Sequence, residues 1–155
     1  MRIHRRDDAQ TLDVPLEEAW AFFSNPGNLA AITPKEIGFV PLTGDGKPVY
    51  PGQVFTYKIS PVAGIPMRWT TEISHVQEQV YFVDIQVSGP YAYWHHLHRF
   101  TSLNAKQTLV EDTLHYAVPG GRLGDLLAGW WVRKAIDQIF THRHQQLEAL
   151  FPPRP

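Results

Sequence analysis

The middle of the chain, from residue 37 to residue 118, alternates between apolar and polar positions and predicts a series of strands. The clearest case covers residues 67–76, where Trp69, Thr71 and Ile73 fall on one face and mostly polar side chains on the other. Turn signals recur about every ten residues, which is typical of an antiparallel meander. The strands are expected at 3–14, 37–42, 53–60, 67–76, 79–87, 93–103 and 107–118, with a turn at 61–66.

Apolar residues at spacings of three and four predict helices on either side of the long strand region. Pro15, Glu17 and Glu18 favour the start of a short helix over 15–25, and a second short helix follows at 28–32. One long helix is expected over 123–151, with a length of roughly 40 Å. Its apolar stripe consists of Leu123, Leu126, Leu127, Trp130, Ala135, Ile136, Ile139, Phe140, Leu147 and Leu150.

The order of these elements predicts a single α+β domain over residues 1–155. One strand comes first, then the two short helices, six further strands and the long helix. An antiparallel sheet of six or seven strands has one apolar face to bury, and the long helix is the available partner. A strongly curved sheet wrapped around one helix leaves a hollow, so an internal cavity is expected between them.

Composition and charge narrow the functional classes. The chain has 155 residues, a net charge of −1 and no cysteine, which excludes disulfides, thiolate metal sites and cysteine nucleophiles. The sequence has no basic run to bind nucleic acid, no apolar run of roughly 18 residues to span a membrane, and no signal-peptide pattern. We therefore expect a cytoplasmic protein, and its 5 tryptophans, 6 tyrosines and 8 phenylalanines suit the wall of an apolar pocket.

Five segments of the chain together match a known pattern. They are VPLEEAWAFFSNPGNLAAITP, MRWTTEI, FVDIQVSGPYAYWHHLHRF, EDTLHYAVPGG and IFTHRHQQLEALF. On these segments the chain resembles the helix-grip superfamily of START-like or SRPBCC proteins. Within it, the chain is similar to the ligand-binding subgroup related to polyketide cyclase/dehydrase and lipid-transport domains. A domain of this type is also fused to epimerase-like proteins labelled cell-division inhibitors.

The resemblance implies a curved sheet around the C-terminal helix and a cavity between them that opens near the short helices. Relatives of this kind mostly bind apolar or amphipathic small molecules, and a minority are cyclases or hydrolases. The superfamily shares no catalytic triad, so the resemblance assigns no catalytic residue by position. Function has to be argued from the residues of the site itself.

Three histidines lie in one predicted strand, and side-chain alternation separates them. One face carries Trp94, His96, His98 and Phe100. We assign this face to the concave side because aromatic residues bracket the histidines, whereas His95 points the other way. The further histidines at 142 and 144 fall on different faces of the long helix and are expected to be solvated.

The neighbouring strands bring carboxylates to the same surface. In the strand at 107–118, Asp112 and Tyr116 lie on the more apolar face. In the strand at 79–87, hydrophobicity alone places the valine and isoleucine face inside. The family pattern instead places Phe82, Asp84 and Gln86 on the same face of the sheet as the histidines. Alternation alone does not decide which of the two faces is inside.

Three interpretations of this polar group remain open. It could be a self-satisfied network that orders the sheet, because buried carboxylates need partners. It could hold the polar head of an otherwise apolar ligand. It could also perform chemistry, either as a metal site built on His-x-His and a carboxylate, or as an Asp–His general base. The residues available for catalysis are His96, His98, Asp84 and Asp112.

We expect a protein that binds a small hydrophobic or amphipathic molecule in the cavity, rather than an enzyme. The alternative is a cyclase, dehydratase or hydrolase that uses an Asp–His pair in the same cavity. No cofactor or metal is expected. One of the tryptophans at 130 and 131 is expected to face solvent or a partner chain, which leaves a homodimer open. The expected lining consists of Trp69, Phe82, Asp84, Gln86, Trp94, His96, His98, Phe100, Asp112, Tyr116 and Trp130.

Overall fold

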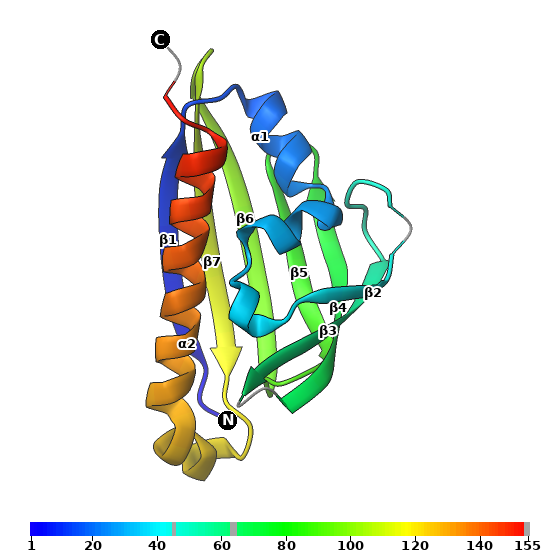
Figure 1. Cartoon of the computed structure of the whole chain (residues 1–155), viewed down its shortest axis with the longest axis vertical. Helices are drawn as coiled ribbons and strands as arrows, with labels where there is room; N and C mark the ends of the chain where they lie inside the picture. Colours follow the sequence, from blue (N-terminus) through cyan, green and yellow to red (C-terminus); the bar gives the residue numbers. More distant parts are fainter. Residues whose placement is uncertain (45, 63–64, 154–155) are drawn as a thin grey trace.

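The computed structural model contains one curved antiparallel sheet with a long helix along one side of it (Figure 1). The structure describes residues 1–44, 46–62 and 65–153, and over these ranges seven strands lie in the order β1-β7-β6-β5-β4-β3-β2. The strands are β1 (His4–Leu12), β2 (Val40–Thr43), β3 (Gln53–Val62), β4 (Ile65–Gln77), β5 (Tyr81–Ser88), β6 (Tyr93–Asn104) and β7 (Gln107–Ala117).

The predicted antiparallel meander is confirmed, and each expected strand is present. β2 to β7 follow one another across the sheet, and β1 pairs with the last strand, so that His4 lies opposite Tyr116. β1 is therefore an edge strand, which agrees with its polar sequence. The turn expected at 61–66 is too long, because residues 61–62 belong to β3 and residues 65–66 to β4. Residues 63–64 lie outside the described residues.

The helices that follow β1 lie over the concave face of the sheet, between β1 and β2 in the chain (Figure 1). They are the α-helix α1 (Leu16–Phe23) and two 3₁₀ helices, η1 (Pro26–Ile32) and η2 (Lys35–Ile37). α1 buries Ala19, Trp20 and Phe23 against the sheet. The two short helices of the prediction correspond to α1 and η1.

The hydrophobic core has two parts. The first part joins α1 to the concave faces of β3 to β7 and includes Trp20, Phe82 and Phe100. The second part joins the long helix α2 (Gly121–Leu150) to β6 and β7, with Leu114 and Ile136 fully buried. β6 contributes residues to both parts.

The first apolar residues of α2 do not face the sheet, and this part of the helix prediction is wrong. The buried residues of α2 are Gly129, Val132, Ile136, Phe140, Arg143 and Leu147. The predicted stripe begins at Leu123, but the first four members of that stripe are exposed. They lie on the side of the helix away from the buried Gly129 and Val132, and so away from the sheet. Helical spacing shows which residues share a face, but it does not show which face meets the sheet.

Polar side chains on the inner face of β1 hold α2 along the edge of the sheet. The pairs are His4 with Asp125 (2.6 Å), Arg6 with Asp137, and Asp8 with His144. Gln10 Nε2 also donates to the backbone carbonyl oxygen of His144 over 3.1 Å. Every second residue of β1 from His4 to Gln10 therefore reaches α2, as the period of a strand requires.

Candidate functional site

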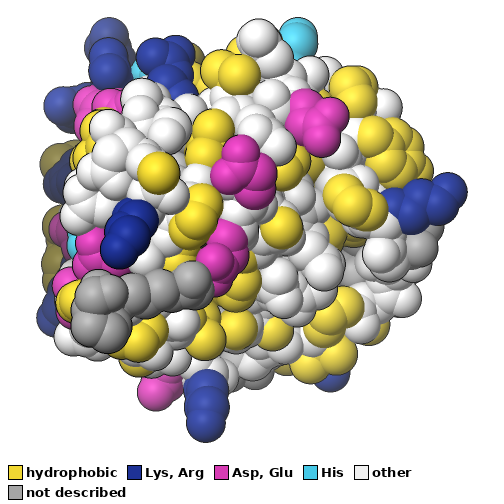
Figure 2. Space-filling view, turned by 90° about the horizontal axis from the view of Figure 1, so that it is seen from above, with side chains coloured by type: hydrophobic (Ala, Val, Ile, Leu, Met, Phe, Trp, Pro, Cys, Tyr) yellow, Lys and Arg dark blue, Asp and Glu magenta, His cyan; other side chains and the backbone are white. Residues whose placement is uncertain are grey.

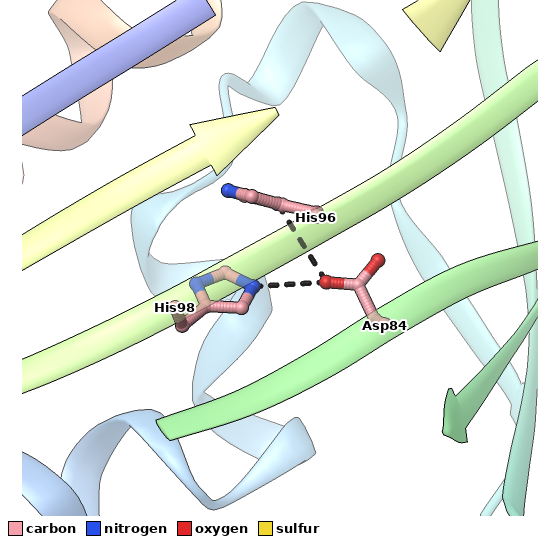
Figure 3. Close-up of side chains that lie close together, drawn as sticks. All are labelled: Asp84, His96 and His98. Carbon is pink, nitrogen blue, oxygen red and sulfur yellow. Dashed lines mark hydrogen bonds and ion pairs between the residues drawn. The ribbon is translucent and has the colours of Figure 1, made fainter. Parts of the chain in front are cut away.

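Two histidines on β6 lie between carboxylates from the strands on either side. In the strand registers, Asp84 of β5 is opposite His96, and Asp112 of β7 is opposite His98. Alternation turns His96 and His98 to the same face, and both side chains are buried. Figure 3 shows that Asp84 points from β5 toward both imidazole rings. The pairing of three strands therefore assembles the cluster.

His98 bridges the two carboxylates, and His96 binds one of them. His98 Nε2–H donates to Asp84 Oδ2 over 2.8 Å, and its Nδ1 lies 2.8 Å from Asp112 Oδ1. Trp94 Nε1–H donates to the other oxygen of Asp84 over 3.0 Å. His96 Nε2–H donates to Asp112 Oδ1 over 3.0 Å. The Nδ1 of His96 is 3.6 Å from Asp84 Oδ2, which is beyond hydrogen-bond distance.

Arg143 connects this network to α2. Its Nη2 lies 2.9 Å from Asp112 Oδ2, and its guanidinium lies over the rings of Phe23 and Phe140. The side chain is buried despite its charge. Because a buried cation needs a charged partner, the pair with Asp112 fixes the position of the helix relative to β7. We refer to Asp84, His96, His98, Asp112 and Arg143 as the polar cluster.

Both carboxyl groups of the polar cluster are held in the ionised form. Burial alone would raise the pKa of Asp112, but the Arg143 guanidinium and the hydrogen bonds from His96 and His98 hold it well below its usual range. Burial also acts to raise the pKa of Asp84. The hydrogen bond from His98, the charges of the imidazoles and the Trp94 N–H outweigh that effect and lower it.

The two imidazoles shift in opposite directions. Burial acts to lower the pKa of His98, but its contacts with Asp112 and Asp84 outweigh burial and raise that pKa. For His96, burial and the charge of His98 lower the pKa by more than the carboxylates raise it. At pH 6.5 His98 is therefore mainly protonated and His96 mainly neutral. The positive charges of His98 and Arg143 then balance the two carboxylates.

An apolar cavity of about 170 Å³ borders the polar cluster. Its wall comes from the short helices, from β3 and β4, and from α2, with Leu29, Ile59 and Ile139 among its side chains. Asp84, His96, His98 and Arg143 supply charged or titratable groups to the wall, so the cavity combines a mainly apolar surface with a small polar region. This combination is typical of ligand sites.

Six of the residues expected at a ligand site lie in the cavity wall. They are Trp69, Phe82, Asp84, Trp94, His96 and His98. On β5, the face indicated by the family pattern is thus the one that turns inward, although Val83 on the other face is also buried. A role of these residues in ligand binding stays a prediction.

The other expected residues lie elsewhere. Phe100 and Tyr116 are buried in the two parts of the core. Gln86 Nε2 donates to the backbone carbonyl of Tyr91 over 2.7 Å and so orders the turn between β5 and β6. Asp112 contacts the two histidines and the helix, so it orients groups that line the cavity.

Trp130 does not line the cavity, because its side chain is on the outer face of α2 and 61% exposed. Its neighbour Trp131 is 37% exposed. The prediction that Trp130 is a lining residue is therefore wrong, for the same reason as for the start of the apolar stripe: the side chain is on the side of the helix away from the buried Gly129 and Val132.

Arg143 is the functional residue that sequence reasoning missed. It lies between two histidines, in a segment that reads as a solvated helix surface. A signal was nevertheless present, because Arg143 follows Ile136 by seven residues and precedes Leu147 by four, which places it on the buried face. The expected exposure of the neighbouring histidines is also only partly correct, since His144 pairs with Asp8.

Three residues of the polar cluster could hold a metal ion. One ligand atom each from Asp84, His96 and His98 lies within 4.8 Å of the others. Two imidazoles and a carboxylate are a donor set for zinc or non-haem iron. A coordinating imidazole must be unprotonated, so a dication would have to displace the proton that His98 shares with Asp84. The charge balance with Arg143 therefore opposes metal binding.

The sheet order, the short helices after β1 and the long C-terminal helix define a helix-grip fold of the START-like class. A family model described as polyketide cyclase/dehydrase and lipid transport matches residues 12–141. The chain belongs to this family. No curated protein sequence matches this chain. Among the described residues, no helix has the length and apolar character needed to cross a membrane.

Solved structures share the fold at low sequence identity. The Zhui aromatase/cyclase from Streptomyces sp. R1128 is 15% identical with a TM-score of 0.72, over 94% of this chain and 92% of that one. Truncated norcoclaurine synthase from Thalictrum flavum is 12% identical with a TM-score of 0.71, over 99% and 96%. Major latex-like protein 151 from Panax ginseng is 15% identical with a TM-score of 0.69, over 97% and 99%. At these identities the similarity establishes the fold alone.

Removal of the Arg143 charge should destabilise the protein strongly. In Arg143→Met, Asp112 keeps its burial but loses its guanidinium partner, and we expect the free energy of unfolding to fall by about 3–5 kcal/mol. Addition of Asp112→Asn should recover part of this loss. The matched control is Arg133→Met, an exposed arginine of the same helix, with an expected change within about 0.5 kcal/mol. Urea unfolding at pH 7 measures the free energy of unfolding of the three variants. An equal decrease for Arg143→Met and Arg133→Met would contradict the buried ion pair of Arg143 with Asp112.

The two cavity histidines should titrate on opposite sides of pH 6.5. Histidine ring signals in NMR spectra, assigned with His96→Gln and His98→Gln, should show a pKa above 6.5 for His98 and below 6.5 for His96. The stability contribution of His98 is then complete below pH 6.5 and lost as pH rises through its folded pKa. The contribution of His96 is complete above pH 6.5 and lost as pH falls. If the pKa of His96 were higher than that of His98, a charged His98 beside a neutral His96 would be wrong.

Proposed function

We propose that the protein binds a small, mainly apolar and uncharged molecule that carries a hydroxyl or carbonyl group. The observation that carries this proposal is a ring nitrogen of His96 at the wall of an apolar cavity: Nε2 donates to Asp112, and Nδ1 lies beyond hydrogen-bond distance of Asp84. The Nδ1 lone pair is therefore the acceptor that the polar cluster offers to a ligand hydroxyl.

The charge balance of the polar cluster supports an uncharged ligand. His98 and Arg143 compensate Asp84 and Asp112, so a fatty-acid carboxylate or an amine would add an unpaired charge to a buried site. The cavity volume supports a ligand of about one ring, because an engineered protein cavity of about 150 Å³ binds benzene. A larger ligand requires movement of the short helices that form part of the wall.

Binding is tested with a matched pair of probes, 4-ethylphenol and ethylbenzene. We expect both to bind the wild-type protein, and His96→Phe to lower the ratio of phenol affinity to hydrocarbon affinity by about twofold to tenfold, the contribution of one hydrogen bond. Ile139→Trp, which fills the cavity, should abolish binding of both probes. Gln138→Trp, an exposed neighbour on the same helix, should not.

Calorimetry or ligand-observed NMR gives the affinities. If neither probe binds, or if Ile139→Trp and Gln138→Trp behave alike, binding in this cavity is wrong. An unchanged affinity ratio in His96→Phe would remove His96 from the recognition of the hydroxyl. Native mass spectrometry of protein from its own host would then identify the ligand class directly.

A second function, acid–base catalysis on a bound carbonyl compound, is favoured by the hydrogen bond between neutral His96 and Asp112. A carboxylate that fixes an imidazole through one nitrogen leaves the other nitrogen as a base toward the cavity. Two structural neighbours are named as an aromatase/cyclase and a norcoclaurine synthase, which places enzymes among proteins of this fold. The reaction class would be proton abstraction next to a carbonyl group.

This second function predicts faster exchange of the methyl protons of acetophenone with D₂O when the ketone is bound. His96→Gln should reduce the enzyme-dependent rate by about 10²-fold or more, the usual contribution of a general base. Asp112→Asn should also reduce it, because the imidazole loses its anionic partner. NMR follows the exchange, and saturable binding of acetophenone without any acceleration would leave a binding protein and exclude this catalysis.

A further inference from the structure

The outward face of the first turns of α2 is apolar, although the surface side of a helix is normally polar. Leu123, Leu126, Leu127 and Trp130 are between 61% and 78% exposed, and we call them the α2 ridge. Their spacings of three, four and seven residues place them on one side of the helix. The opposite side contains Gly129 and Val132 and is buried.

The exposed apolar surface is confined to one end of the molecule. Further along α2 the outward positions are polar and exposed, as at Lys134, Gln138 and Gln145. The ridge thus occupies the N-terminal part of α2, at the lower end of the molecule in Figure 1. Met1 is also exposed and lines a surface depression together with Leu126 and Trp130.

Basic residues surround the α2 ridge. Arg2, Arg122 and Arg133 line the same surface depression. The acidic residue there is Asp125, which is paired with His4 at 2.6 Å and with Arg2 at 3.4 Å. Three arginines thus line this depression with one aspartate, although the whole chain has a net charge of −1. The opposite end, which Figure 2 shows, has acidic side chains near its middle.

A second copy of the chain does not fit this surface well. A stable interface buries about 800 Å² and about 20–30 residues on each partner. The exposed apolar side chains here are the α2 ridge, Met1, Ile3 and Trp131. A two-fold contact across the ridge would also bring the arginines of one copy against those of the other. A lipid surface needs neither a large interface nor a complementary shape.

We propose that the α2 ridge docks the protein on a membrane surface that contains anionic lipids. The leucine and tryptophan side chains insert at the boundary between headgroups and acyl chains, and Arg2, Arg122 and Arg133 bind lipid phosphates. Leucine and tryptophan on one face, beside arginines, are the composition of helices that bind this boundary. The docking surface lies outside the cavity wall, so it stands independently of the ligand.

Flotation of the full chain with vesicles tests this docking. The vesicles are phosphatidylcholine alone, or phosphatidylcholine with phosphatidylglycerol in a ratio of roughly 7:3, an anionic surface that attracts basic segments. We expect the wild-type protein to float with the anionic vesicles and much less with the neutral ones. Arg122→Gln with Arg133→Gln should weaken binding by roughly fivefold for each arginine.

The double variant Leu126→Gln with Trp130→Gln should reduce binding by about tenfold or more, because it removes two inserted side chains. The matched control Leu103→Gln changes an exposed leucine on β6 and should bind like the wild type. Circular dichroism verifies the fold of each variant. Absence of wild-type flotation, equal binding by the ridge variant and the control, or a monomer–dimer equilibrium that only the ridge variant abolishes would each overturn the proposal.

Discussion

The buried ion pair between Asp112 and Arg143 is the constraint on which the arrangement of the site depends. Asp112 is on β7 and accepts from His96, contacts His98 and pairs with the helix, so one carboxylate connects sheet, histidines and α2. None of these groups is independently stable in the interior, because an unpaired buried charge is very unfavourable. The position of α2 over the sheet and the protonation of the histidines are therefore two results of the same pairing.

This pairing also explains how two adjacent imidazoles can differ in charge. His98 has a carboxylate at each ring nitrogen, whereas His96 has one close carboxylate and a cationic neighbour. A small rearrangement that separated Arg143 from Asp112 would change both titrations together. The charges in the cavity wall thus depend on a residue of the helix as well as on the strands.

The sequence predicted the buried side chains correctly where the alternation of a strand matches the face that packs against the rest of the protein. Alternation assigned Trp94, His96 and His98 to one face of β6 because a strand in the middle of a sheet keeps that period. It did not assign β5, where Phe82 and Val83 are both buried, and the family resemblance decided that face. Arg143 was missed and Trp130 was misassigned because helical spacing alone does not specify which face of the helix meets the sheet.

α2 packs against β6 and β7 on one side and against β1 on the other, and different interactions hold the two contacts. Toward β6 and β7 the contact is apolar, with Leu114 and Ile136 fully buried, and salt does not weaken it. Toward β1 the contact is polar: it consists of the exposed Arg6–Asp137 ion pair and of contacts made by His4, Asp8 and Gln10. Such pairs are screened as ionic strength rises. A rise in ionic strength therefore weakens the contact of α2 with β1 and leaves its apolar contact with β6 and β7 unchanged.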